Sequence, residues 1–188
     1  DEITNPIGYP EGDDYMRGQE LLMNAVNWIE AQNLVSDDDI LDYNADGEID
    51  VISFIVSGHV DDWSDLLWPH KYALYEGLDD TYRFSEDTPM INGKYAYNYI
   101  FMLLGDEEEA SPYFDLGTFA HEMFHIVGAP DLYHYYSEDT IDPVSSWGLM
   151  GSPTDIPIQM LLYMKETYGG WLQDTQEVTV SGTYTLNK

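Results

Sequence analysis

The stretch HEMFHIVGAPD constrains this chain more than any other segment. On a helix, His121 and His125 lie one turn apart on the same face, so both imidazoles can reach one metal ion. Glu122 adjoins the first of them and suits a general base that activates water. Gly128 can end the helix in a left-handed conformation, and Ala-Pro then turns the chain so that Asp131 supplies a third ligand. Three protein ligands with one open position predict a catalytic zinc; the alternative is an acidic amphipathic helix with two surface His residues.

The overall charge excludes two classes of partner. Six Lys and Arg residues stand against 36 Asp and Glu residues, which gives a formal net charge of −30 over 188 residues. Such a surface repels nucleic acid and anionic membranes, so we expect neither as a partner. The chain has no cysteine, hence no disulfide and no thiolate metal site, and no apolar run long enough to span a membrane.

The first residue is Asp1, without an initiator Met or an apolar leader. We interpret the chain as a mature or excised segment whose export signal lay upstream, and we expect a secreted or cell-surface protein. A prosegment or additional domains outside this chain are compatible with that expectation.

Hydrophobic periodicity predicts an α+β fold. We expect a twisted mixed sheet that packs on an N-terminal helix and on the zinc helix, with a small C-terminal helical subdomain. The expected elements are a helix over 15–32, a buried strand over 51–56, a second strand over 95–104, a zinc helix that begins between 111 and 115, a helix over 158–168, and two short strands in 177–186. Residues 1–176 would form the catalytic domain, and 177–188 the truncated start of a β-rich element.

A second candidate site is the loop DYNADGEID. Asp42, Asn44 and Asp46 carry side-chain oxygens at alternate positions, and a glycine follows the third, as in the first half of an EF-hand. The main-chain carbonyl of Glu48 and the carboxylate of Asp50 would add further ligands. The twelfth position is a serine rather than a glutamate, so the loop predicts a structural calcium site that is not a full EF-hand. The alternative is an Asx-rich turn without metal.

A methionine in a glycine-flanked turn, SWGLMG, follows the zinc motif. Taken alone, Met150 in such a turn indicates core filling. Together with the extended zinc motif, it resembles the Met-turn of the metzincins, in which a methionine lies beneath the metal.

The chain resembles the catalytic domain of the immune-inhibitor-A-type secreted bacterial metallopeptidases, a metzincin-like family. The family's acidic loop and following strand are matched by DYNADGEIDVISFIVSG, and its Trp-x-His segment by LLWPHKY. Its zinc helix is matched by GTFAHEMFHIVGAPDLY, its Met-turn by SSWGLMGSP and its closing helix by IQMLLYMKETYGGW. The chain departs from the family pattern at Phe124, where glycine is common, and at His134, where Asp is common. Substrate preference therefore does not carry over.

The resemblance implies a secreted zinc metalloendopeptidase that cleaves extracellular proteins or peptides, with Glu122 as the base. A tyrosine often assists the oxyanion in related enzymes, and Tyr133, Tyr135 and Tyr136 are the candidates. In such enzymes an extended peptide adds to an edge strand above the zinc helix. Residues 95–104 are the candidate for that strand, with an ordinary core strand as the alternative.

The other histidines have plainer interpretations. His70 is expected to be a satisfied structural residue rather than a catalytic or metal-binding one. His134 could compete as third ligand, but the spacing favours Asp131. His59 lies in the acidic segment SGHVDDW, which indicates a surface turn, with a second cation site as the alternative.

Two other functions are compatible with these residues. One is an extracellular binding module stabilised by calcium and a structural zinc, which would need a closed fourth zinc position and no role for Glu122. The other is a zinc hydrolase of a non-peptide amide or ester, which would have a closed pocket instead of an open cleft.

Overall fold

The computed structural model shows an α+β protein with few helices and a small mixed sheet. The residues that the structure describes are 14–57, 68–74, 88–104, 114–135, 143–154, 156–172 and 177–185. Among them, no helix is both long enough and apolar enough to cross a membrane. The predictions for Tyr136 and His59 lie outside these residues.

Helix α1 covers Asp14–Ala31 and confirms the predicted N-terminal helix. Its inward face buries Leu22 and Val26, which are 3% and 0% exposed. These side chains are one helical turn apart, as expected for an apolar face that packs on a sheet. Helix α1 therefore forms one wall of the main core.

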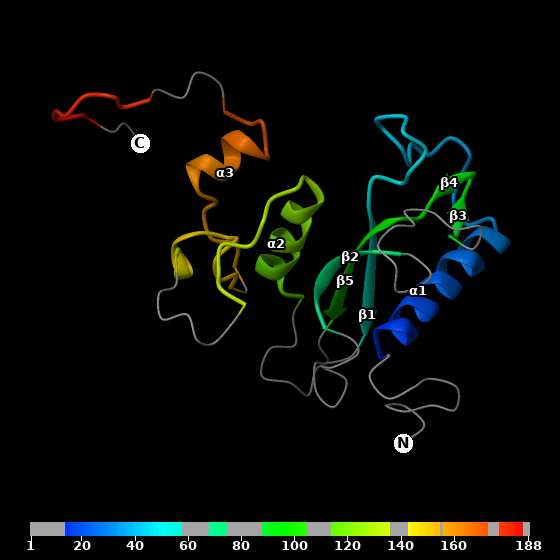
Figure 1. The fold of residues 1–188 in the computed structure, drawn as a ribbon. Coiled ribbons are helices and arrows are strands. Elements are labelled where there is room, and N and C mark those ends of the chain that lie inside the picture. The colour runs from blue at the N-terminus through cyan, green and yellow to red at the C-terminus, as the bar shows by residue number, and fades with distance from the viewer. Residues whose placement is uncertain are drawn as a thin grey trace.

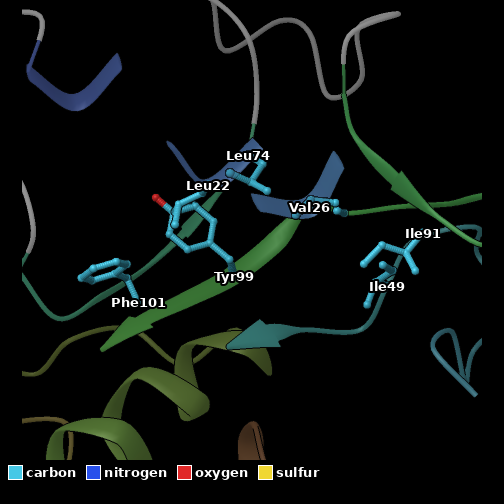
Figure 2. Packing of buried hydrophobic residues seen from close by; sticks show 8 residues of the cluster. Leu22, Val26, Ile49, Leu74, Ile91, Tyr99 and Phe101 are labelled. Carbon is cyan, nitrogen blue, oxygen red and sulfur yellow. The ribbon is translucent and has the colours of Figure 1, made fainter. Parts of the chain in front are cut away.

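The main sheet has the strand order β1-β5-β2. Strand β1 (Ile52–Ser57) is parallel to β5 (Asn98–Leu104), whereas β2 (His70–Ala73) is antiparallel to it. The sheet lies between α1 and α2 (Figure 1). A short hairpin of β3 (Met90–Ile91) and β4 (Lys94–Tyr95) packs near α1. Figure 2 shows the core between α1 and the sheet, whose buried members are Leu22, Val26, Ile49, Leu74, Ile91, Ala96, Tyr99 and Phe101.

Strand β5 is central, so residues 95–104 do not supply the edge strand for which they were the candidate, and the alternative of a core strand is confirmed. The predicted strand is also divided, because Tyr95 pairs with β3 whereas β5 begins at Asn98. Tyr99 and Phe101 join the core with α1, and Ile100 and Met102 are also fully buried, so both faces of β5 are covered. The apolar run reflects this double burial rather than an open edge.

Strand β1 confirms a strand close to the predicted 51–56, but the prediction that it is buried is wrong. Its residues alternate between half-buried and exposed, and Ile55 is 52% exposed. Within the described residues β1 pairs with β5 alone. One face of β1 packs on the core and the other is open, although both carry β-branched residues.

Helix α2 (Leu116–Ile126) lies between the sheet and α3 (Leu162–Thr167) in Figure 1. On its side away from the sheet is a second core cluster, whose buried members are Phe124, Ala129, Leu149, Met150 and Met164. Met150 is 1% exposed and packs with residues of both helices. The turn that contains Met150, the predicted Met-turn, thus joins α2 to α3.

Two C-terminal predictions need correction. Helix α3 is shorter than the predicted 158–168, because the preceding residues run extended and the Gln159 carbonyl accepts a hydrogen bond from Leu149 N–H at 3.3 Å. Helix α3 does end before Gly169-Gly170, and Gly170 has a φ of 61°. Residues 177–185 contain no strand, and they extend away from α3 without a partner strand (Figure 1).

Candidate metal centre

Local sequence signals set both ends of α2. Asp115 is the N-cap: its carboxylate accepts hydrogen bonds from the Thr118 N–H at 2.8 Å and from the Thr118 hydroxyl at 2.6 Å. At the other end Val127 is the C-cap, and Gly128 follows with a φ of 91°. This left-handed conformation favours glycine, and it turns the chain toward Asp131 as predicted.

The three predicted zinc ligands gather at one point. The His121 and His125 Nε2 atoms are 3.2 Å apart, and Asp131 Oδ1 lies 2.9 Å and 3.3 Å from them. Ligand atoms about 2.0–2.1 Å from a tetrahedral zinc are separated by roughly 3.3 Å. Within the described ranges, these residues are the one group of three whose ligand atoms come close enough to share a metal ion.

The outer ring nitrogens show which electron pairs face this point. His121 Nδ1 lies 2.9 Å from the Leu149 carbonyl oxygen, and His125 Nδ1 lies 2.7 Å from that of Ala129. Because a carbonyl can only accept, each Nδ1 donates, and in the neutral ring each Nε2 then presents a lone pair. Asp131 Oδ1 is buried and accepts no hydrogen bond from the residues described. With both rings neutral, three electron pairs face one another with no donor between them, an arrangement that fits a metal cation.

The electrostatics agree with a cation site. Burial alone would lower the pKa of His121 and His125, but the Asp131 carboxylate, the backbone carbonyl at each Nδ1 and the Glu122 charge together outweigh it and raise both. Burial would likewise raise the pKa of Asp131, but its contacts with both imidazoles hold that pKa far below the ordinary value. The site therefore attracts positive charge, whether as protons or as a metal ion.

Glu122 lies beside this group and is 8% exposed. Its Oε2 accepts a hydrogen bond of 2.7 Å from the Lys71 N–H in β2. Burial raises the pKa of Glu122, and the nearby imidazoles and this N–H oppose the rise. No sequence pattern indicates the Lys71 contact, because a main-chain N–H makes it.

The Met-turn supports the site through its main chain. The Leu149 carbonyl fixes the His121 ring, and the next carbonyl, that of Met150, accepts a hydrogen bond from Leu132 N–H at 2.7 Å. The turn thereby holds both the first ligand and the residue after Asp131. The sequence motif predicted a role for the Met150 side chain. The contacts of the Leu149 and Met150 carbonyls could not be predicted in this way, because no residue type marks a main-chain contact in the sequence.

The candidate tyrosines lie close to the ligands. The Tyr133 ring stacks on His121, with centroids 6.3 Å apart and planes 20° apart. The Tyr135 hydroxyl donates to Asp131 Oδ2, and this contact raises the pKa of Tyr135 to about 12. Asp131 thus has one oxygen toward the imidazoles and the other held by Tyr135. His134 is exposed and does not belong to the group of gathered ligand atoms.

His70 has a protein partner at each ring nitrogen. Its Nδ1 donates to the Trp68 carbonyl, and its Nε2 lies 3.0 Å from the Tyr99 hydroxyl. The Gln19 amide donates to that hydroxyl at 3.2 Å, and the ring stacks on Phe101. Burial lowers the pKa of His70, which favours the neutral form that this chain of hydrogen bonds requires. These contacts fit the predicted structural role.

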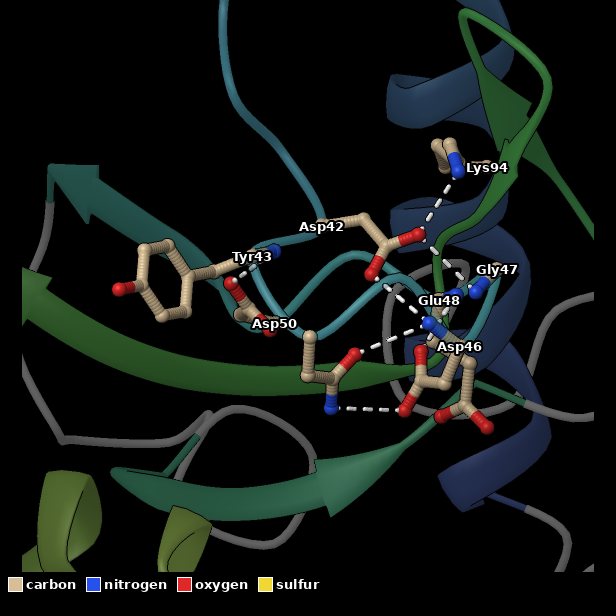
Figure 3. Close-up of polar contacts among 8 residues, drawn as sticks. Asp42, Tyr43, Asp46, Gly47, Glu48, Asp50 and Lys94 are labelled. Atoms are coloured by element: carbon tan, nitrogen blue, oxygen red, sulfur yellow. Dashed lines mark hydrogen bonds and ion pairs between the residues drawn. The ribbon is translucent and has the colours of Figure 1, made fainter.

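In the predicted calcium loop, carboxylate oxygens face donors of the protein itself (Figure 3). The two oxygens of Asp42 accept hydrogen bonds from Asp46 N–H at 3.1 Å and Gly47 N–H at 3.0 Å. The Lys94 ammonium lies 2.7 Å from Asp42 Oδ2, and this hydrogen bond lowers the pKa of Asp42.

The side-chain oxygens of the remaining loop residues also accept hydrogen bonds from main-chain N–H groups of the loop. Asn44 Oδ1 accepts from Asp46 N–H at 3.0 Å, and Asp46 Oδ1 from Glu48 N–H at 2.9 Å. Asp50 Oδ2 accepts from Tyr43 N–H at 3.0 Å. The structure thus brings the predicted residues into one loop without gathering their carboxylates at one point, and calcium binding there stays a prediction.

No protein-family model, curated protein or solved structure matches the chain. The functional interpretation therefore depends on the site itself.

Proposed function

We propose that the chain is the catalytic domain of a zinc-dependent endopeptidase of the metzincin type, similar to the immune-inhibitor-A peptidases. The observation that carries the proposal is the convergence of three ligand atoms from His121, His125 and Asp131, within 3.3 Å of one another. The packing of Met150 in one buried cluster with Phe124 of α2 supports the same assignment. A secreted location and a calcium-stabilised loop remain predictions from the sequence.

A general base beside the metal-ligand group accounts for hydrolysis. A bound zinc ion would polarise both a water molecule and the scissile carbonyl. Glu122 accepts the proton of the attacking water and returns it to the leaving amine. Its Oε2 is held by Lys71, while no described residue hydrogen-bonds to its Oε1, so this oxygen is available for the proton.

Strand β2, rather than β5, supplies the edge for an extended peptide. The Leu74 N–H donates to the Tyr97 carbonyl at 2.8 Å, toward β5. Hydrogen-bonded and non-hydrogen-bonded pairs alternate along an antiparallel ladder, so the main-chain groups of Lys71 and Ala73 are directed away from β5. On this side Glu122 takes Lys71 N–H, and Gln19 donates to the Ala73 carbonyl at 3.1 Å. Among the described residues, the Lys71 carbonyl and the Ala73 N–H have no partner, and we assign them to a peptide backbone beside α2.

Metal removal tests the proposal. A peptide library is incubated with the zinc-loaded protein, with the protein after chelation, and with the chelated protein after zinc is restored, and the products are identified by mass spectrometry. We expect cleavage in the first and third samples and none in the second, because water activation requires the metal. Cleavage that survives chelation, or no cleavage by the zinc-loaded protein, would contradict the proposal.

A further inference from the structure

We propose that the main-chain N–H of Lys71 is a positioning group for the base Glu122, so that β2 orients the base as well as the substrate. This inference depends on the proposed function. The hydrogen bond from Lys71 N–H to Glu122 Oε2 is 2.7 Å long and joins residues 51 positions apart. Glu122 is 8% exposed, so water competes little for the carboxylate.

The Lys71 N–H can make this bond because alternate residues of β2 direct their main-chain groups toward β5 or away from it, and Lys71 is one that points away. Lys71 pairs with Ile100, but its N–H is directed away from β5 and is not needed for the ladder. His70 and Tyr72 hold β2 to β5 on either side of it. An outward main-chain N–H of an edge strand can donate a hydrogen bond to a neighbouring helix without loss of a hydrogen bond within the sheet.

The strand itself is held in place by buried polar contacts. His70 Nε2 lies 3.0 Å from the Tyr99 hydroxyl in β5, and Gln19 of α1 donates to both that hydroxyl and the Ala73 carbonyl. These bonds fix β2 along its axis relative to β5 and α1. They thereby fix the position of the Lys71 N–H relative to α2. The stacking of His70 on Phe101 adds to this effect.

A fixed Oε2 limits the rotation of the Glu122 carboxylate. The second oxygen, Oε1, then keeps one direction, and the proton that it accepts is transferred along a set path. Without the Lys71 N–H the carboxylate can turn about its terminal torsion, whose energy profile is broad. The rate of the chemical step should fall, while peptide binding, which uses other groups of β2, should change less.

Backbone variants at neighbouring outward positions test this role. Lys71→Pro deletes the N–H that holds Glu122, and Ala73→Pro deletes the N–H assigned to the substrate; neither removes a ladder hydrogen bond, so edge-strand proline is tolerated at both. We expect Lys71→Pro to lower kcat by roughly 10–100-fold with KM little changed. We expect Ala73→Pro to raise KM by about tenfold with kcat little changed. Zinc affinity, measured on both variants, should match wild type and verifies the fold.

A second measurement does not depend on catalysis. In the ¹H–¹⁵N spectrum of the wild type, the Lys71 amide proton should lie far downfield, and Glu122→Gln should move it upfield by replacing a charged acceptor with a neutral one. The inference would be overturned by an unchanged kcat in a zinc-binding Lys71→Pro variant, or by a Lys71 amide proton whose chemical shift is the same in Glu122→Gln. Neither result would contradict the proposed peptidase. A wild type that cleaves no peptide would overturn the proposed function, and with it the catalytic role of this N–H.

Discussion

Replacement of Glu122 by Gln is expected to lower kcat by about 10²–10⁴-fold, since general-base catalysis contributes an effect of that size. Gln is nearly isosteric and can still accept a hydrogen bond from the Lys71 N–H through its amide oxygen. It cannot take a proton from water at neutral pH. The zinc ligands His121, His125 and Asp131 are untouched, so zinc affinity should stay close to the wild-type value.

Steady-state kinetics on one peptide cleaved by the wild type, with zinc content measured for each sample, separates the two effects. Glu20→Gln, an exposed substitution of the same type on α1, is the matched control and should leave kcat unchanged. Full activity of Glu122→Gln would show that another group acts as the base or that a contaminating peptidase is present.

Gly117→Ala is expected to destabilise the protein by about 3 kcal/mol, the upper end of the range for overpacking in a filled interior. A Cβ at Gly117 would lie 1.5 Å from the Thr154 carbonyl oxygen and 2.7 Å from its carbon. Both are main-chain atoms, so no side-chain rotation relieves the clash. The first turn of α2 must separate from the segment that follows the Met-turn.

Urea denaturation of the metal-free proteins measures this loss. Leu116→Ala, at the neighbouring and 51% exposed position of α2, is the control and should cost much less. Because the Leu149 carbonyl of the same turn holds His121, we also expect weaker zinc binding by Gly117→Ala. A Gly117→Ala protein as stable as the control would mean that α2 and this segment are not in contact.

Spacing along one helix made the ligand set predictable. The His121 and His125 rings meet because residues four apart share a helix face, and Gly128 ends that helix in the conformation its motif requires. These relations are local and need no knowledge of the rest of the fold. The same holds for helix α1, whose buried face follows directly from its apolar periodicity.

Relations between distant segments were not predictable in this way. Nothing in YAYNYIFMLL specifies that β5 has neighbours on both sides, and the sequence left an edge strand and a core strand as alternatives. The groups that orient the site are the Lys71 N–H and the carbonyls of Ala129 and Leu149. Every residue has a main-chain carbonyl and every residue except proline an N–H, so only the folded chain selects which of them orient the site.

The measurement that tests the metal centre most directly is a competition titration of zinc into the wild type and Asp131→Asn at mildly alkaline pH. That pH limits protonation of His121 and His125, whose pKa values the carboxylate raises. We expect one tightly bound zinc per wild-type chain. We expect Asp131→Asn to bind about 100-fold more weakly, because one of three ligands loses its charge, a loss of roughly 3 kcal/mol. No stoichiometric zinc in the wild type, or equal affinity in both proteins, would contradict the proposed metal centre.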